Sequence, residues 1–210
     1  MSNEEKQERE LRAVAAGGKL MGRENMIKWE KLAANEKKQF EKMNEREKFV
    51  YFLLLQYGSP YGWGNENPER SDCSGAVCMA LFASTGHLIR ATADGLYKNV
   101  FTKERPRSGD IRAVFYITKK DGRHGDRTVS AGTAVHIAGI LEDGIILNSQ
   151  EPYARLRKIS DVSDWYRRNG CEVAVRGLNR EALARLADEG KTRYGIDREF
   201  WQYFEVKREK

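Results

Sequence analysis

The chain has 210 residues, of which 40% are hydrophobic and 32% are charged. This length fits one domain with sizeable extensions, and the richest apolar run, residues 49–55, is far too short to span a membrane. The 37 Lys and Arg against 31 Asp and Glu give a net charge of +6, a modest excess that favours acidic partners. Membrane insertion is therefore excluded, and because the basic residues are interleaved with acidic ones, nucleic-acid binding is not expected.

The N-terminus and the cysteines indicate where the protein is made. Residues 1–6 show no basic segment leading into an apolar one, so we expect no secretory signal peptide and synthesis in the cytoplasm. Cys73, Cys78 and Cys171 form no CxxC pair and leave one cysteine over, which argues against a disulfide framework and against a cysteine-rich zinc site. Free thiols are therefore expected.

The first half of the chain predicts helices around a loop. Residues 1–47 alternate acidic and basic side chains and contain glycines, which indicates a charged, partly helical N-terminal extension. Apolar residues at spacings of three, four and seven over residues 40–57 predict an amphipathic helix that ends at Gly58. A loop rich in turn formers and aromatic residues follows. A second helix then starts at Asp72, or one residue earlier, and stops near Gly86.

The second half changes to short β-like runs at residues 111–118, 134–141 and 144–147. Asp-Gly between the last two runs predicts a tight hairpin. The polar, glycine-rich residues between the first two runs predict a long exposed loop, at 119–133. Because this loop is basic, we expect it to overhang the substrate-binding cleft of the domain and to take part in substrate choice.

Helices return at the C-terminus, around residues 180–189 with Asn179 as the cap, and around residues 197–206. A helix, then an antiparallel sheet, then further helices predict an α+β domain. We expect this domain over residues 48–165, with a helical extension over residues 166–210 packed on its core.

Three residues have the types and positions of a cysteine hydrolase. Cys73 lies in the first turn of a predicted helix, where the helix dipole and unpaired N–H groups favour a thiolate and can stabilise an oxyanion. His136 lies inside an apolar strand and is the best candidate base. Asn148 ends the next strand, where its side-chain oxygen can orient the imidazole, as in a papain-type triad. Taken singly, Cys73 and His136 could each be an ordinary core residue.

Five short motifs follow one another in the chain: Ser59–Gly64, Asp72–Gly75, Arg90–Asp94, Gly109–Ile111 and His136–Ile140. Their residues, Ser-Pro-Tyr-Gly-Trp-Gly, Asp-Cys-Ser-Gly, Arg-Ala-Thr-Ala-Asp, Gly-Asp-Ile and His-Ile-Ala-Gly-Ile, closely resemble those of the NlpC/P60 family of cell-wall cysteine peptidases, in the family's order. The resemblance covers residues 49–152. It implies a papain-like α+β fold in which the helix carrying the nucleophile packs on an antiparallel sheet.

The resemblance also implies roles for the candidate catalytic residues. It makes Cys73 the nucleophile, His136 the base, and Asn148, twelve positions further on, the orienting residue. The family commonly has histidine where this chain has Asn148, but an amide oxygen can still accept the imidazole N–H. Gly95 replaces a family glutamine, which puts one substrate or packing contact in doubt, and Ala138 replaces a family glycine.

Four further residues are implied to contact the substrate. Tyr61 would support the oxyanion or the substrate, and Trp63 lies in the same loop. Asp72 and Ser74 would hold charged groups of the stem peptide. Loop packing is the structural alternative for Tyr61 and Trp63, and helix capping is the alternative for Asp72.

The function implied by this resemblance is a thiol protease of cell-wall degradation, which hydrolyses an amide in the peptidoglycan stem peptide after a D-glutamyl residue, with no metal or cofactor. One alternative keeps the triad and changes the reaction, to an N-acetylmuramoyl-L-alanine amidase or an amide acyl transferase. A second alternative is a non-catalytic wall-binding module. Because a wall substrate lies outside the membrane, the missing export signal suggests a phage or prophage endolysin released by lysis, a holin or the virion, or a leader that has been removed.

Overall fold

The computed structural model describes residues 34–67, 70–124, 127–142 and 144–188. The helix predicted over residues 197–206 and most of the N-terminal extension lie outside these ranges. Among the residues that the structure describes, no helix combines the length and apolar character needed to cross a membrane.

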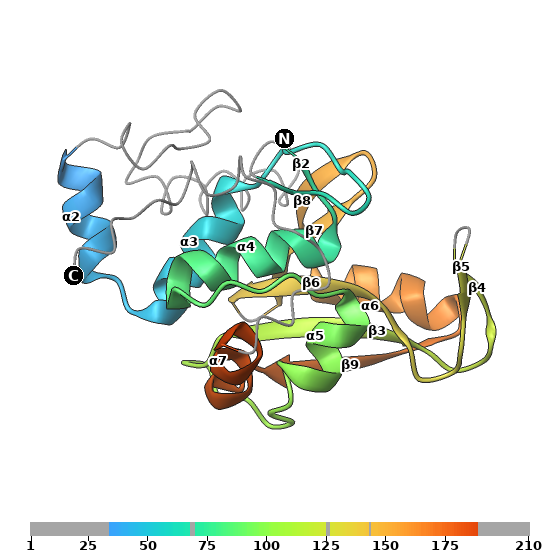
Figure 1. Ribbon diagram of the computed structural model, residues 1–210. Helices are drawn as coiled ribbons and strands as arrows, with labels where there is room; N and C mark the ends of the chain where they lie inside the picture. The colour runs from blue at the N-terminus through green and yellow to red at the C-terminus, as the bar shows by residue number, and fades with distance from the viewer. Residues whose placement is uncertain (1–33, 68–69, 125–126, 143, 189–210) are drawn as a thin grey trace.

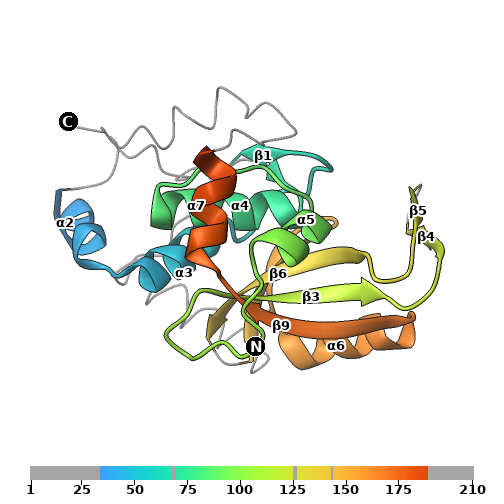
Figure 2. The same ribbon diagram turned by 60° about the horizontal axis from the view of Figure 1, so that its bottom comes forward.

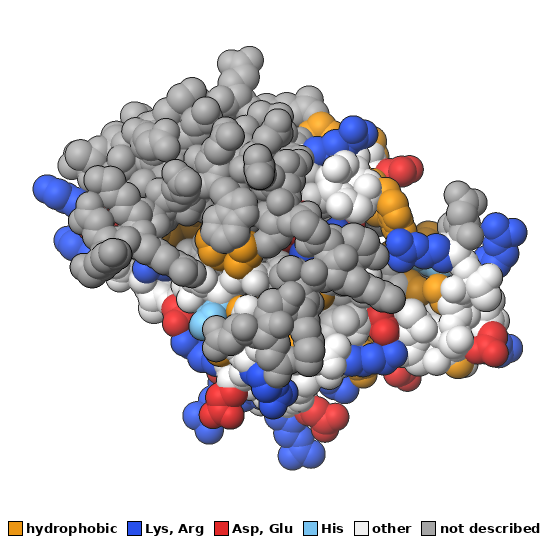
Figure 3. All heavy atoms as spheres, in the orientation of Figure 1, with side chains coloured by type: hydrophobic (Ala, Val, Ile, Leu, Met, Phe, Trp, Pro, Cys, Tyr) orange, Lys and Arg blue, Asp and Glu red, His pale blue; other side chains and the backbone are white. Residues whose placement is uncertain are grey.

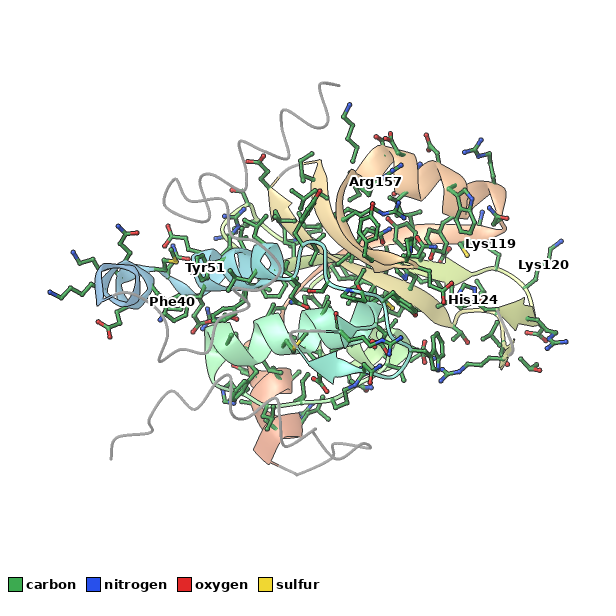
Figure 4. The ribbon with its side chains drawn as sticks, turned by 90° about the horizontal axis from the view of Figure 1, so that it is seen from above. Phe40, Tyr51, Lys119, Lys120, His124 and Arg157 are labelled. Carbon is green, nitrogen blue, oxygen red and sulfur yellow. The ribbon has the colours of Figure 1, made fainter. Side chains whose placement is uncertain are left out.

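The single helix predicted over residues 40–57 is in fact two helices, α2 (Ala34–Lys42) and α3 (Glu45–Leu55). Asn44 interrupts them by capping α3. Its side chain accepts the N–H of Glu47, and the Glu47 carboxylate accepts the N–H of Asn44. Such a capping box starts a new helix although the apolar spacing continues. Phe40 of α2 keeps contact with Tyr51 of α3, with ring centroids 5.8 Å apart (Figure 4).

Helix α4 (Cys73–Thr85) begins and ends where its capping residues predict. The Asp72 side chain accepts the N–H of Gly75, and Gly86 ends the helix in the left-handed conformation, with φ of 75°. Almost every residue of α4 is buried, so this helix runs through the centre of the domain. The shorter helix α5 (Ala93–Asn99), capped by Thr92, was not predicted.

An antiparallel sheet of five strands, in the order β8-β7-β6-β3-β9, forms the other half of the domain. Its strands are β3 (Arg112–Thr118), β6 (Ala134–Glu142), β7 (Ile145–Gln150), β8 (Tyr153–Lys158) and β9 (Cys171–Gly177). The first three match the predicted β-like runs. The predicted hairpin pairs Ile140 of β6 with Ile146 of β7, and its turn residue Asp143 lies outside the described residues.

The C-terminal part of the sheet differs from the prediction. Residues 171–177, which fall in the predicted helical extension, form strand β9, and it pairs with β3 along its whole length. Strand β8 and helix α6 (Ile159–Arg168) were also not predicted. Helix α7 (Arg180–Asp188) begins as predicted, because the Asn179 side chain accepts the N–H of Ala182.

Helices cover both faces of the sheet (Figures 1 and 2). Helices α3, α4, α5 and α7 lie on one face over the larger apolar core, and α6 lies on the other face over a smaller one. Alternate residues of β3 divide between the cores, so Phe115 joins the first and Tyr116 the second.

Two short hairpins complete the fold. One pairs β1 (Glu66–Asn67) with β2 (Arg70–Ser71) just before α4. The other pairs β4 (Gly122–His124) with β5 (Arg127–Val129), inside the loop predicted at 119–133. This hairpin projects from the sheet where β3 ends and β6 starts (Figure 1).

Candidate active site

Cys73 brings the start of α4 against strand β6. It is the first residue of the helix, and its side chain is only 9% exposed. The backbone of Ile137 and the backbone of Ser74 hydrogen-bond to the thiol. Because Ile137 directly follows His136, the sulfur lies next to the strand segment that carries the candidate base.

His136 is held from the neighbouring strand. Its Nε2 lies 2.7 Å from Oδ1 of Asn148, and both side chains are buried. The Asn148 Nδ2 donates to Oε1 of Gln150 at 3.2 Å, which orients the amide so that its oxygen faces the ring. An amide oxygen only accepts, so Nε2 must carry a hydrogen, and Nδ1 is then the unprotonated nitrogen that can take a proton from a thiol.

An aromatic stack fixes the plane of the His136 ring. Tyr166 of α6 stacks on the imidazole with ring centroids 5.3 Å apart and an interplanar angle of 17°. Tyr116 lies against both rings, with its centroid 4.1 Å from that of Tyr166 and 5.7 Å from that of His136. Sequence analysis missed Tyr166 because it did not predict α6, and nothing in the local sequence connects this tyrosine with a strand thirty residues earlier.

Burial favours the neutral forms of the cysteine and the histidine. It raises the pKa of the Cys73 thiol to about 12, helped by the negative charge of Asp72 and opposed by the two backbone hydrogen bonds. Burial also lowers the pKa of His136 to about 4, opposed by the hydrogen bond to Asn148. Desolvation thus opposes the thiolate expected from the helix start and favours a thiol and a neutral imidazole in the resting site.

Asp72 and Ser74 both bind within the protein. Oδ2 of Asp72 accepts from Nη2 of Arg90 at 2.8 Å. The Ser74 hydroxyl accepts from Nη1 of Arg90 at 2.9 Å and donates to Oδ1 of Asp72 at 2.8 Å. These contacts hold the start of α4 in place. A role for either residue in contacting substrate stays a prediction.

Arg90 and Glu66 have a structural role. Sequence analysis assigned no role to either residue. Nε of Arg90 lies 3.1 Å from Oε2 of Glu66, and both side chains are buried. Burial raises the pKa of Glu66 to about 8, although the charge of Arg90 opposes the shift. Arg90 opens one of the five motifs, so its position was visible in the sequence, whereas its partners were not.

Tyr61 lies beside the nucleophile and Trp63 lies further out. The pKa of Tyr61 is raised, mainly by burial and then by its proximity to the ionisable groups of Cys73 and Asp72. Trp63 is 57% exposed, and the guanidinium of Arg127 lies over its ring, 4.3 Å from the centroid. Sequence analysis did not predict this contact between the loop and the β4–β5 hairpin.

A cavity of about 610 Å³ opens beside Asn148, between strands β7 and β8 and helix α6. Its lining includes Gln150, Arg155, Arg157, Trp165 and Tyr166. Across the ranges that the structure describes, no group of three or more His, Cys, Asp or Glu side chains could hold a metal ion.

Comparison with solved structures gives distant similarities. NlpC1 from Trichomonas vaginalis is 14% identical over 64% of this chain and 44% of its own, with a TM-score of 0.44. A lipoprotein-like NLP/P60 family protein from Staphylococcus aureus is 17% identical over 64% of this chain and 41% of its own, with a TM-score of 0.46. This chain thus spans less than half the length of these two proteins.

RipD from Mycobacterium tuberculosis, described as a non-catalytic NlpC/p60 domain protein adapted to peptidoglycan binding, is 17% identical over 64% of this chain and 97% of its own, with a TM-score of 0.43. Comparison with curated protein sequences gives no match. The model of the NlpC/P60 family, however, matches residues 58–168, which is more than half of the chain. This match covers the helix of Cys73, the strands of His136 and Asn148, and the helix of Tyr166. The match and the observed helices and antiparallel sheet together assign the α+β papain-like fold. The chain belongs to the NlpC/P60 family, whose members are generally peptidoglycan hydrolases and include some non-catalytic proteins.

Proposed function

We propose that this chain is a cysteine peptidase that hydrolyses an amide bond in the stem peptide of peptidoglycan, after a D-glutamyl residue and before a diamino acid. The observation that carries the proposal is that the Cys73 thiol, the His136 ring and the Asn148 amide are all buried, with Cys73 against the histidine strand. The Cys73 thiol contacts the backbone beside His136, and His136 contacts Asn148 at 2.7 Å. Nucleophile, base and orienting group thus follow one another in the order that covalent catalysis requires.

The proposed reaction passes through a thioester. Sγ of Cys73 attacks the scissile carbonyl carbon while its proton moves to Nδ1 of His136, and the oxyanion forms near the N–H groups at the start of α4. Collapse of this intermediate breaks the C–N bond, and the leaving amine takes the proton from His136. Water then attacks the thioester, gives a proton to His136, and releases the carboxylic acid, after which the proton returns to sulfur.

The test is mass spectrometry of purified peptidoglycan after digestion, with Cys73→Ala and Cys78→Ala as a matched pair. Both cysteines are buried in α4, but the hydrogen bond of the Cys78 thiol goes to the carbonyl of Ala91, at 3.9 Å. We expect the wild type and Cys78→Ala to release fragments with a new amino group on the diamino acid. Cys73→Ala should release none while its circular dichroism remains that of the wild type. Fragment release by Cys73→Ala would contradict the mechanism.

The same digest separates the alternative functions. A new amino group on L-alanine, with a free muramoyl carboxylate, would identify an amidase. Transfer of the acyl group to an added amine would identify an acyl transferase. Sedimentation of the protein with intact peptidoglycan, without any new amino group, would identify a wall-binding module.

We also propose delivery to the wall from inside a lysing cell or from a virion, as in a phage lysin. The net charge of +6 supports attraction to anionic wall polymers. Added to cells whose outer envelope has been permeabilised, the protein should reduce turbidity, and the rate should fall with increasing salt. Unchanged turbidity at low salt would contradict this part of the proposal.

A further inference from the structure

The β4–β5 hairpin begins and ends beside the histidine strand. The N–H of Thr118 donates to the carbonyl of Thr133 at 2.9 Å, and the N–H of Gly132 donates to the carbonyl of Thr118 at 2.7 Å. Strand β3 pairs Tyr116 with His136, two residues before this closure. The hairpin is therefore anchored where the candidate base lies.

The far part of the hairpin contacts the loop that leads to the nucleophile. Arg127 of β5 lies over the ring of Trp63, which stands two residues after Tyr61. The charge of Arg127 lowers the pKa of Tyr61, against the larger effects of burial, Cys73 and Asp72, so the guanidinium lies within electrostatic range of the site. The hairpin thus connects the strand of His136 with the loop of Tyr61, along one border of the active site.

Arg127 has the free hydrogen-bonding capacity of a ligand-binding residue. Within the described part of the chain its guanidinium contacts the Trp63 ring, and no hydrogen bond or ion pair of this group accompanies that contact. By comparison, Arg90 is paired with Glu66 and Asp72. A guanidinium that stacks on an aromatic face keeps its N–H donors around its edge, where they match the two oxygens of a carboxylate.

The surroundings of Arg127 also favour an anion. Basic and acidic side chains both lie at the hairpin end of the molecule (Figure 3), and residues 119–133 contain four Lys and Arg against two Asp. Lys119 and Lys120 lie at its outer end, and the Lys120 side chain points outward (Figure 4). Arg127 is exposed, but its guanidinium lies over the Trp63 ring, and this contact favours one orientation in which it can distinguish a carboxylate by geometry as well as by charge.

We infer that Arg127, held on Trp63, binds a carboxylate of the substrate, so that the enzyme selects stem peptides with a free carboxylate near the scissile amide over the same peptides with a carboxamide there. This inference rests on the proposed function for its substrate. It assigns to the 119–133 loop a specific residue that binds substrate and a specific chemical group that this residue recognises. A carboxamide carries no charge and presents an N–H₂ where the guanidinium needs an acceptor, which leaves a donor facing a donor.

The test compares two synthetic stem peptides that differ only in carboxylate against carboxamide. We expect the wild type to prefer the carboxylate peptide by about 10- to 100-fold in kcat/KM, the size of one hydrogen-bonded charge pair. In Arg127→Gln the preference should fall to about twofold or less, through a higher KM for the carboxylate peptide. Arg127→Lys should keep part of it, because the charge remains and the paired donors are lost. Lys120→Gln removes a charge from the same hairpin and should keep all of it.

Binding measured in a Cys73→Ala background separates this inference from the proposed function. Calorimetry should show tighter binding of the carboxylate peptide, and the difference should disappear in Cys73→Ala/Arg127→Gln. This result without hydrolysis of either peptide by the wild type would support the inference and contradict the proposed function. Hydrolysis of both peptides at equal kcat/KM would overturn the inference and leave the proposed function standing. An equal loss of preference in Lys120→Gln and Arg127→Gln would also overturn it.

Discussion

At the scale of single residues, the position of one proton distinguishes this site from a thiolate–imidazolium pair. The Cys73 sulfur and the His136 ring are both buried, and Asn148 supplies an uncharged acceptor in place of a carboxylate. An uncharged partner stabilises imidazolium less than a carboxylate would, so desolvation dominates. The nucleophile should therefore be deprotonated as it attacks, with His136 acting as general base.

The pH dependence of kcat/KM should show directly whether His136 is neutral before the reaction. A base works only when unprotonated, and the pKa of His136 is lowered from 6.5 to about 4, so the base remains competent as the pH falls through the usual histidine range. We expect the acidic limb of the profile to lie closer to pH 4 than to pH 6.5. A limb at the ordinary histidine pKa would show that burial does not lower the pKa of His136, and rapid alkylation of Cys73 below pH 7 would show a thiolate in the resting site.

Asn148→Asp gives the matched control for this profile. The substitution keeps the shape of the side chain and places a negative charge at the atom that now lies 2.7 Å from Nε2. A carboxylate there favours imidazolium, so the acidic limb should move to higher pH by about one unit or more. An unchanged limb would show that His136 does not govern the profile.

At the scale of elements, the starts of α4 and α5 give a natural comparison. Gly75 and Gly95 are each the third residue of their helix, and each donates its N–H to the side chain of the capping residue. A Cβ on Gly75 would fall far inside van der Waals contact with the backbone carbonyl of Asn65. A Cβ on Gly95 would meet only ordinary contacts, at 3.4 Å and beyond. Glycine is thus required in α4 because the loop carrying Tyr61 passes directly against the helix start.

Alanine at the two positions should have opposite effects. Gly75→Ala should lower the free energy of unfolding by about 1–3 kcal/mol, because a backbone segment must move, and should also reduce kcat by displacing the loop beside Cys73. Gly95→Ala should raise it by about 0.5–1 kcal/mol, because alanine loses less entropy in a helix. Denaturant titration of both variants measures the two changes in the free energy of unfolding. Equal effects would show that the Asn65 contact does not constrain the helix.

Most elements that were predicted carry local signals, and those that depend on distant partners were missed, although the local caps at Asn44 and Thr92 were missed as well. Asp72 and Gly86 bound α4 through caps that lie next to it in the chain. By contrast, β9 is a strand because β3 lies beside it, and no residue near 171–177 reports that partner. The same division holds in the site, where the ordered motifs contain Cys73 and His136. The contact of Arg127 with Trp63 joins residues more than sixty positions apart and has no sequence signal.

At the scale of the whole molecule, the folded unit extends beyond the family match. The match ends at residue 168, yet β9 pairs with β3 in the main sheet, and α7 packs on the core that contains Cys73. The N–H of Leu178 donates to the carbonyl of Ile111 at 2.9 Å and thereby connects the end of β9 to the start of β3. The C-terminal residues up to 188 thus belong to the same folded unit as the helix of Cys73 and are not an appendage of it.

Leucines on α7 test this assignment. Leu183 is fully buried in the large core, whereas Leu186, one turn further on, is only partly buried. Leu183→Ala should lower the free energy of unfolding by about 2–5 kcal/mol, because it leaves a cavity among α7, the sheet and α4, while Leu186→Ala should cost about half as much or less. Thermal and denaturant unfolding of both variants measures the difference. We expect a single transition, in which the near-UV signal is lost together with the rest of the folded structure. If α7 were an independent appendage, Leu183→Ala would leave the main transition unchanged, because the sheet and the helix of Cys73 would unfold without it.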